Sequence, residues 1–316
     1  MKQKKTPVRA LLLALILLTV AALAVLNLTR QRAAEPPDTS AVSERLSAMA
    51  EESAPAVSEP EPDGADAAES TGQAAGSAGA PASDLAPEGD PYPGLYVRYE
   101  EKTDDNTQKI VYLTFDDGPS ENTDRILEIL KQYDVKATFF VSGQYGTTEE
   151  RAQRMRDILD QGHTLGLHTY SHNYKKIYAS MDAYLADLNQ INEEVVAATG
   201  YHPSLIRFPG GSRNHYNDHI CEELTAEVTR RGYTYHDWAV SCGDAEGKNL
   251  SAAQEMWETA DACEKRAKSV VLFHDTPAQD ATVEALGGLI EELWSQGYEF
   301  RALDDSIRPF QFVEQE

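Results

Sequence analysis

The sequence is poor in basic residues and in cysteine. Of its 316 residues, 28 are Lys or Arg and 52 are Asp or Glu, which gives a formal net charge of −24. Because binding to a nucleic-acid backbone depends on clustered basic side chains, this balance argues against nucleic acid as a partner. The three cysteines, Cys221, Cys242 and Cys263, are too few for a disulfide framework. One bridge with a free thiol and three free thiols both remain open.

Long apolar runs are also scarce, with one exception near the N-terminus. A basic segment, residues 2–9, precedes an uncharged stretch rich in Leu, Ala and Val at residues 10–28. This length is close to the roughly 20 residues that cross a bilayer as a helix, and the basic side is expected to stay in the cytoplasm. We therefore predict that residues 1–29 form a cytoplasmic stub and a transmembrane signal-anchor. Residues 22–24 resemble a cleavage site, so a cleaved signal peptide and a secreted protein are the alternative.

Residues 33–90 lack aromatic side chains and carry thirteen acidic residues against one basic residue, Arg45. Ala, Ser, Pro and Gly make up much of the remainder. Such a composition cannot bury enough apolar area to offset the entropy lost on ordering. We predict a disordered acidic linker over residues 30–104 that holds the following domain away from the membrane.

Beyond this linker, residues 105–316 alternate between short apolar runs and helical periodicity. Ile126, Ile129 and Leu130 have helical spacing after Ser120, a residue type that caps helices. Strands that alternate with helices predict βαβ units and a parallel sheet. Seven strand-like runs occur, at residues 110–115, 137–141, 164–168, 205–208, 234–240, 270–274 and 298–303. Seven units favour a closed or nearly closed β/α barrel, and a doubly wound open sheet is the alternative that the pattern leaves open.

Polar residues follow several of these runs, at the strand ends where β/α barrels carry their chemistry. His168 and His172 are spaced so that both imidazoles can face one point, and Asp117 follows the first strand. Two imidazoles and a carboxylate are a typical ligand set for a catalytic zinc-like site, which leaves one position for water. The sequence therefore indicates a metal centre at this edge of the sheet.

The neighbours of these three residues supply acid–base groups. A cation next to adjacent carboxylates favours their ionised forms, so Asp116 can stay free and take a proton from water as a general base. His274, at the end of another apolar strand, has a residue type that titrates near neutral pH and can act as a general acid. Arg207 offers a planar donor pair that can hold Asp116.

Five motifs, in this order, resemble those of the polysaccharide deacetylases of carbohydrate esterase family 4, whose shared region is called the NodB homology domain. They are TFDDG at 114–118, HTYSH at 168–172, RFPGG at 207–211, DWAVSCGDA at 237–245 and LFHD at 272–275. The resemblance spans about residues 107–308. It implies a distorted (β/α)7 barrel in the predicted domain.

The resemblance also implies a role for each matching residue. Asp117, His168 and His172 become ligands of one divalent metal ion, usually zinc and sometimes cobalt. Asp116 becomes the catalytic base and His274 the general acid. Arg207 would hold Asp116, and Asp244 would pair with His274.

Three positions depart from the common pattern. Leu167 replaces an Asn that is common before the first metal-binding histidine. Gly210 stands where many members have Tyr, and Ala245 follows Asp244 where an aromatic residue is common. The resemblance implies that the residue at this position donates its backbone N–H to the oxyanion, so the presence of Gly210 is expected to alter side-chain contacts to sugar and to leave the chemistry in place.

These features predict a metal-dependent hydrolase that removes N-acetyl groups from amino sugars of an extracellular polysaccharide, with peptidoglycan as the first choice. An O-deacetylase of a glycan such as xylan and a non-catalytic, membrane-anchored glycan-binding protein are the alternatives. The expected partners are an N-acetylglucosamine polymer and, through the N-terminal helix, the cell membrane. The sequence points to no obligate protein partner.

Overall fold

The computed structural model describes residues 82–98, 102 and 109–313. The predicted signal-anchor at residues 1–29 and most of the predicted linker lie outside these residues. Within the part of the chain that is described, no helix combines the length and the apolar character needed to cross a membrane. All three cysteines are buried and carry free thiols.

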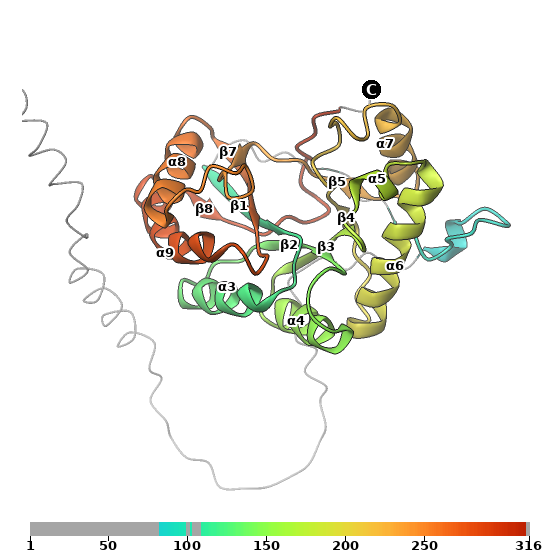
Figure 1. Ribbon diagram of the computed structural model, residues 1–316, viewed down its shortest axis with the longest axis horizontal. Coiled ribbons are helices and arrows are strands. Elements are labelled where there is room, and N and C mark those ends of the chain that lie inside the picture. Colours follow the sequence, from blue (N-terminus) through green and yellow to red (C-terminus); the bar gives the residue numbers. More distant parts are fainter. Residues whose placement is uncertain (1–81, 99–101, 103–108, 314–316) are drawn as a thin grey trace, which may run out of the picture. The chain divides into compact units, whose positions relative to one another are not determined.

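Eight strands form one sheet in which every pairing is parallel. The sheet order is β5-β4-β3-β2-β1-β7-β6, and β8 pairs with the beginning of β1. No pairing joins β5 to β6 among the described residues, so the curled sheet stays open on one side, as in a distorted barrel (Figure 1). The strands are β1 (Ile110–Asp116), β2 (Thr138–Ser142), β3 (Thr164–Thr169), β4 (Leu205–Ile206), β5 (Thr234–Tyr235), β6 (Val240–Ser241), β7 (Lys268–His274) and β8 (Glu299–Phe300).

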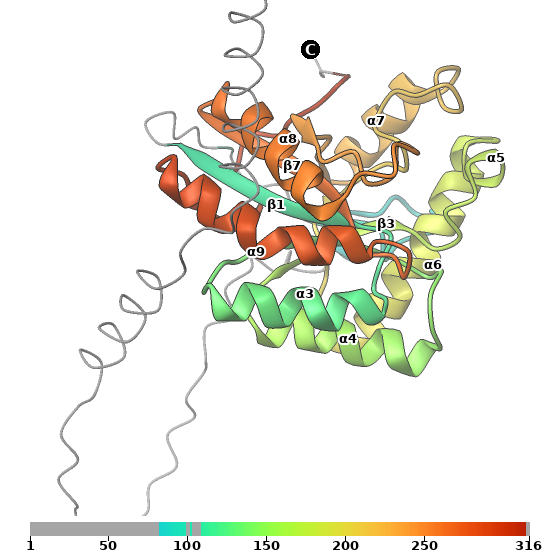
Figure 2. The same ribbon diagram turned by 60° about the vertical axis from the view of Figure 1, so that its left-hand side comes forward.

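Helices connect the strands and lie around the outside of the curled sheet, with α3, α4 and α9 side by side along one flank (Figure 2). They are α3 (Glu121–Gln132), α4 (Thr148–Asp160), α5 (Tyr174–Ile177), α6 (Met181–Thr199), α7 (Cys221–Arg230), α8 (Ala252–Glu264) and α9 (Asp280–Ser295), and a short 3-10 helix, η1, covers Ser83–Leu85. The predicted helix after Ser120 is confirmed as α3, whose N-terminus is closed by a capping box between Ser120 and Thr123.

The two faces of the sheet have different neighbours because strand side chains alternate. On β1, Val111, Leu113 and Phe115 join the large apolar core that the helices cover. Ile110 and Tyr112 point to the other face and join a smaller cluster inside the curl. Alternation then directs Asp116, the last residue of β1, to this inner face as well.

The predicted strand at residues 234–240 is instead two short strands on opposite edges of the sheet. The amide of His236 donates to the carbonyl of Ile206 in β4, whereas the amide of Ala239 donates to the carbonyl of Val270 in β7. Between them, the amide of Asp237 donates to the carbonyl of Phe310. The chain therefore crosses the open side of the sheet here, and this is why eight strands replace the seven that were predicted.

The structure also differs from the predicted linker over residues 82–98. Leu95 and Val97 are buried in the main core, and the amide of Val97 donates to the carbonyl of Arg231 over 2.9 Å. The buried guanidinium of Arg231 pairs with Asp90 at 2.9 Å. The prediction of disorder rested on the average composition of residues 33–90. Apolar residues that follow this segment, Leu95 and Val97, are enough to attach residues 82–98 to the folded domain.

A substitution at Gly232 tests whether residues 82–98 pack against the domain as described. Gly232 has a φ of +92°, and a Cβ there would meet the carbonyl oxygen of Val97 at 2.0 Å. Gly200 is a matched control with a φ of +70° and open space around it. Gly200→Ala should cost about 1–2 kcal/mol for the left-handed backbone, and Gly232→Ala should cost about 1–3 kcal/mol more because of overpacking. Urea unfolding measures both, and limited proteolysis should cut residues 82–98 faster in the Gly232 variant alone. Equal behaviour of the two variants would contradict the docking.

Candidate active site

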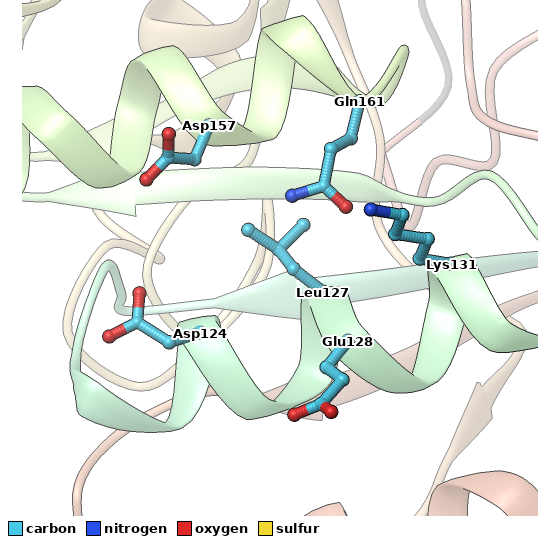
Figure 3. Close-up of a pocket in the computed structure, with 6 residues that line it drawn as sticks. All are labelled: Asp124, Leu127, Glu128, Lys131, Asp157 and Gln161. Atoms are coloured by element: carbon cyan, nitrogen blue, oxygen red, sulfur yellow. The ribbon is translucent and has the colours of Figure 1, made fainter.

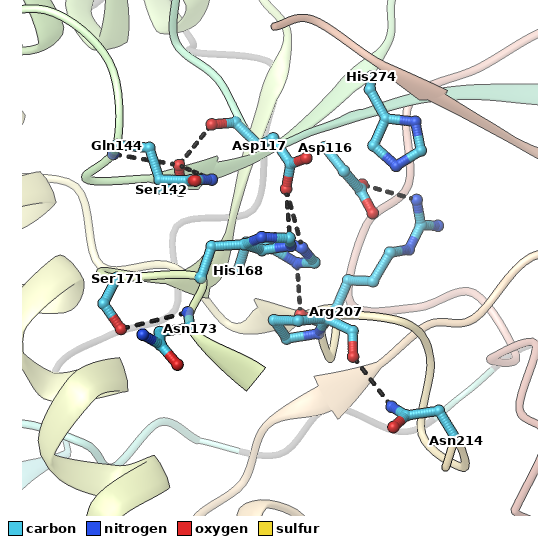
Figure 4. A network of polar contacts seen from close by, with 12 residues as sticks. Asp116, Asp117, Ser142, Gln144, His168, Ser171, Asn173, Arg207, Asn214 and His274 are labelled. Atoms are coloured by element: carbon cyan, nitrogen blue, oxygen red, sulfur yellow. Dashed lines mark hydrogen bonds and ion pairs between the residues drawn. The ribbon is translucent and has the colours of Figure 1, made fainter. Parts of the chain in front are cut away.

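Four strands bring the site residues to one edge of the sheet. Asp116 and His274 are register partners at the ends of β1 and β7. His168 lies in β3, and Arg207 follows β4, where its amide donates to the carbonyl of Leu167. Because the carboxyl ends of parallel strands meet at one edge, residues far apart in sequence converge here (Figure 4).

The predicted metal ligands do come together. Nε2 of His168 lies 3.3 Å and Nε2 of His172 3.1 Å from Oδ1 of Asp117. Asp117 has a φ of 76° and His172 a φ of 48°, in the left-handed region that residues other than glycine seldom adopt. The fold therefore maintains two unfavourable backbone conformations at the residues that aim these ligand atoms.

The protonation of these groups fits a divalent cation. Nδ1 of His168 lies 2.7 Å from the carbonyl oxygen of Arg207, so this nitrogen carries the proton and Nε2 presents its lone pair towards Asp117. Burial lowers the pKa of His172 to about 4, so its imidazole is neutral at pH 7. Oδ1 of Asp117 is buried without a hydrogen-bond partner. Lone pairs that face one another in a buried place need a cation between them, and imidazole with carboxylate is a ligand set typical of zinc.

Asp116 stays outside this cluster because Arg207 holds it. Nη1 of Arg207 donates to Oδ1 of Asp116 over 2.9 Å, and both side chains are buried. The other guanidinium donors bond to the carbonyls of His236 and Asp237, and the guanidinium stacks on Phe140 at 4.4 Å. No hydrogen bond of the described residues reaches Oδ2 of Asp116, so this oxygen is available to accept a proton.

His274 is oriented by Asp244, as predicted. Oδ1 of Asp244 lies 2.7 Å from Nδ1 of His274, and Oδ2 accepts from the His274 amide at 2.8 Å. Burial alone would lower the pKa of His274, but the hydrogen bond and charge of Asp244 outweigh burial and, with Asp117 and Asp116, raise it to about 9. His274 is therefore protonated at neutral pH and presents Nε2 as its free ring nitrogen.

The turn after Asp117 is tightly packed. A Cβ at Gly118 would meet the Asp275 carboxylate at 2.1 Å, so only glycine fits. Asp275 is buried, accepts from the Thr123 hydroxyl at 2.6 Å, and donates its amide to the carbonyl of Asp116. Asp275 thus ties the end of β1 to the start of α3.

Gly210 lies at the rim of the site. It is exposed, has a φ of +74°, and its N–H makes no hydrogen bond within the described residues. Tyr174 of α5 fills the space beside it, since a Cβ at Gly210 would meet that ring at 2.9 Å. The Tyr174 ring also contacts His172, with centroids 5.1 Å apart, and the half-exposed Tyr216 at 5.0 Å.

Sequence reasoning overlooked these tyrosines, because neither follows a strand. It also gave no role to Asp237, whose two oxygens accept from the amide and hydroxyl of Ser212 and from the amide of Phe312. Asp237 thereby anchors the loop that carries Arg207 and Gly210.

A separate pocket lies between α3 and α4, away from the predicted residues (Figure 3). Its lining is Asp124, Leu127, Glu128, Lys131, Asp157 and Gln161. It includes none of the candidate catalytic or metal-binding residues.

Comparisons with known proteins agree with this geometry. The family model for polysaccharide deacetylase matches residues 103–230. A putative polysaccharide deacetylase, YheN, of Bacillus subtilis is 34% identical over 69% of this chain and 75% of that protein. A peptidoglycan-N-acetylglucosamine deacetylase of Bacillus cereus is 31% identical over 65% of this chain and 73% of that protein.

Solved structures show the same relationship. The catalytic domain of a peptidoglycan N-acetylglucosamine deacetylase from Eubacterium rectale is 37% identical, with a TM-score of 0.64 over 69% of this chain and 98% of that domain. Motifs, fold and relatives therefore agree, and the chain belongs to the polysaccharide deacetylase family, carbohydrate esterase family 4.

Proposed function

We propose that the protein is a metal-dependent deacetylase that hydrolyses N-acetyl groups on amino sugars of an extracellular polysaccharide, with peptidoglycan as the substrate. The observation that carries this proposal is the arrangement around the partnerless Oδ1 of Asp117, with two imidazole nitrogens beside it and Asp116 held apart by Arg207. The names of the Bacillus cereus and Eubacterium rectale relatives, both peptidoglycan N-acetylglucosamine deacetylases, support peptidoglycan as the substrate.

Asp117, His168 and His172 would hold a divalent ion, with zinc the first choice and cobalt the second. Bound there, the ion would polarise the acetyl carbonyl and acidify a water molecule. Asp116, fixed by Arg207, takes the proton of the attacking water on its free Oδ2. The ion pair between Arg207 and Asp116 keeps Asp116 oriented as a proton acceptor, while the neighbouring Asp117 would bind the metal ion.

His274 acts on the nitrogen of the acetamido group, and Gly210 acts on its carbonyl oxygen. The protonated His274, aligned by Asp244, delivers its proton to the departing sugar nitrogen, which leaves as an amine. The free N–H of Gly210 donates to the developing oxyanion. An amine leaving group needs this proton more than an alcohol does, so a histidine that stays protonated at pH 7 favours N-deacetylation over O-deacetylation.

The location belongs to the same proposal. A signal-anchor at residues 1–29 would keep the protein in the cell membrane with its catalytic domain outside, where peptidoglycan lies. Cleavage of that segment would instead release a secreted enzyme to the same substrate.

Substrate and base are tested together by incubating the full chain with peptidoglycan, chitooligosaccharide or acetylxylan and locating new free amines or hydroxyls by mass spectrometry. Amines on peptidoglycan are expected. Asp116→Asn should lower the rate about 10²- to 10⁴-fold, since general-base catalysis contributes this much. Glu128→Gln, an exposed change in the pocket of Figure 3, is the control and should leave the rate unchanged. A nearly normal rate for Asp116→Asn would contradict the assigned base, and glycan binding without hydrolysis would favour the binding-protein alternative.

Metal removal gives a second test. Dialysis against a chelator should abolish hydrolysis, and zinc or cobalt should restore it, because the ion supplies the transition-state charge stabilisation. His172→Ala should lose the ion, as measured by elemental mass spectrometry, and should not be rescued by stoichiometric zinc. Full activity in a chelated sample that contains no metal would refute the metal centre.

The pH profile tests His274. Asp244→Asn removes the largest contribution that raises the pKa of His274, so the pKa should fall from about 9 towards or below 6.5. The acid form is then lost at lower pH, and the alkaline limb of kcat should move down by about two pH units. The rate should fall most at pH 8–9 and least at pH 6. An unmoved alkaline limb would exclude His274 as the general acid.

A further inference from the structure

A second carboxyl group lies next to Asp244. Glu255, on α8, has 1% of its surface exposed, and its Oε1 has no hydrogen-bond partner. Ligand atoms of Glu255, Asp244 and Cys242 lie within 4.8 Å of one another. None of these contacts involves the proposed metal ligands, so the feature is separate from the metal centre.

Both carboxylate oxygens of Asp244 already take part in hydrogen bonds, and Oδ1 has room for a further donor. Its Oδ1 contacts Nδ1 of His274 at 2.7 Å, and its Oδ2 accepts from the His274 amide at 2.8 Å and from the Thr282 hydroxyl at 3.2 Å. Thr282 comes from α9, which packs against α8. Asp244 is therefore fixed between the imidazole on one strand and the helix pair that carries Glu255.

Two carboxyl groups this close in a buried place cannot both ionise without cost. Burial raises the pKa of Glu255 to about 7. A hydrogen bond from Thr282 lowers the pKa, the charge of Asp244 raises it by less than Thr282 lowers it, and Cys242 and His274 lower it by still smaller amounts. Burial also raises the pKa of the Cys242 thiol, which remains protonated. Glu255 therefore changes charge near neutral pH, within 4.8 Å of the carboxylate that orients His274.

We propose that Glu255 is a positioning residue for the deacetylation proposed above, acting through Asp244 to set how firmly His274 holds its proton. Ionised Glu255 adds negative charge beside Asp244 and strengthens its hold on the imidazolium. Protonated Glu255 removes that charge and can donate a hydrogen bond to Asp244. The titratable groups that face this network are Asp244, Cys242 and His274 around Glu255, and Asp244, Asp116 and Asp117 around His274.

Glu255→Gln keeps the shape and removes the charge, so the alkaline limb of kcat should move to lower pH by about one unit, a tenfold change in His274 protonation. At pH 6, where Glu255 is protonated in the native chain, the rates should agree within about twofold. Glu258→Gln, an exposed carboxyl change on the same helix, should leave the profile unchanged. A native profile in Glu255→Gln would overturn the proposal.

A second measurement requires neither substrate nor catalytic turnover. Exchange of the imidazole C2 hydrogen, followed by mass spectrometry on the 269–301 peptide, reports His274 alone because this peptide has no other histidine. The pKa of His274 should fall in Glu255→Gln and equally in Glu255→Met, an apolar variant of similar length. In an Asp244→Asn background the Glu255 change should add nothing, because non-additivity identifies residues that act as a unit.

Additive shifts would show that Glu255 acts on His274 without Asp244 and would overturn the proposed route. Two metal ions per chain, with one lost in Glu255→Gln, would also overturn it, by showing that Cys242, Asp244 and Glu255 bind metal instead. If the exchange shift appears but no polysaccharide is deacetylated, the proposed function fails while the link between Glu255 and His274 stands.

Discussion

The pairing of Arg207 with Asp116 is the interaction on which the site depends. A fully buried guanidinium is costly unless its donors are paired, and here two carbonyls, the Thr114 hydroxyl and the Asp116 carboxylate accept hydrogen bonds from all three of its nitrogens. The carbonyl of Arg207 also accepts from Nδ1 of His168, which turns Nε2 towards Asp117. One residue thus orients both the proposed base and a proposed metal ligand, so its loss would disturb two functions at once.

The site uses one residue type in two opposite ways. Burial lowers the pKa of His172 to about 4, so it is a neutral ligand, whereas Asp244 raises that of His274 to about 9, so it is an acid. Both side chains are largely shielded, and each has a carboxylate near a ring nitrogen, Asp117 at 3.1 Å from His172 and Asp244 at 2.7 Å from His274. At His172 burial outweighs the nearby negative charge, whereas at His274 the hydrogen bond and charge of Asp244, with the charges of Asp117 and Asp116, outweigh burial. The balance of burial and neighbouring charge, and not distance along the chain, therefore assigns the two roles.

Much of this arrangement was predictable from local sequence. Short apolar runs located β1 and β7, and a parallel sheet requires their carboxyl ends to meet at one edge, so Asp116 and His274 could be expected near each other. Other features depend on distant contacts. Tyr174 lies beside Gly210 because the fold brings α5 next to the loop that follows β4. Leu95 is buried in a segment that is held to the domain by the hydrogen bond from the amide of Val97 to the carbonyl of Arg231. The division of residues 234–240 into β5 and β6 also depends on distant contacts. The run resembles one strand in the sequence, but its first part pairs with β4 and its last part with β7.

The sequence by itself determined the chemical inventory, namely which carboxylates, imidazoles and guanidinium follow which strands, because strand periodicity and residue type are local properties. Tertiary structure decided which of these groups act on one another: Asp116 is held by Arg207 while Oδ1 of Asp117 is left without a hydrogen bond, and carboxylate atoms of Glu255 and Asp244 lie within 4.8 Å of each other. Burial and the orientation of lone pairs depend on atoms contributed by other segments, and only the folded chain brings those atoms within bonding distance.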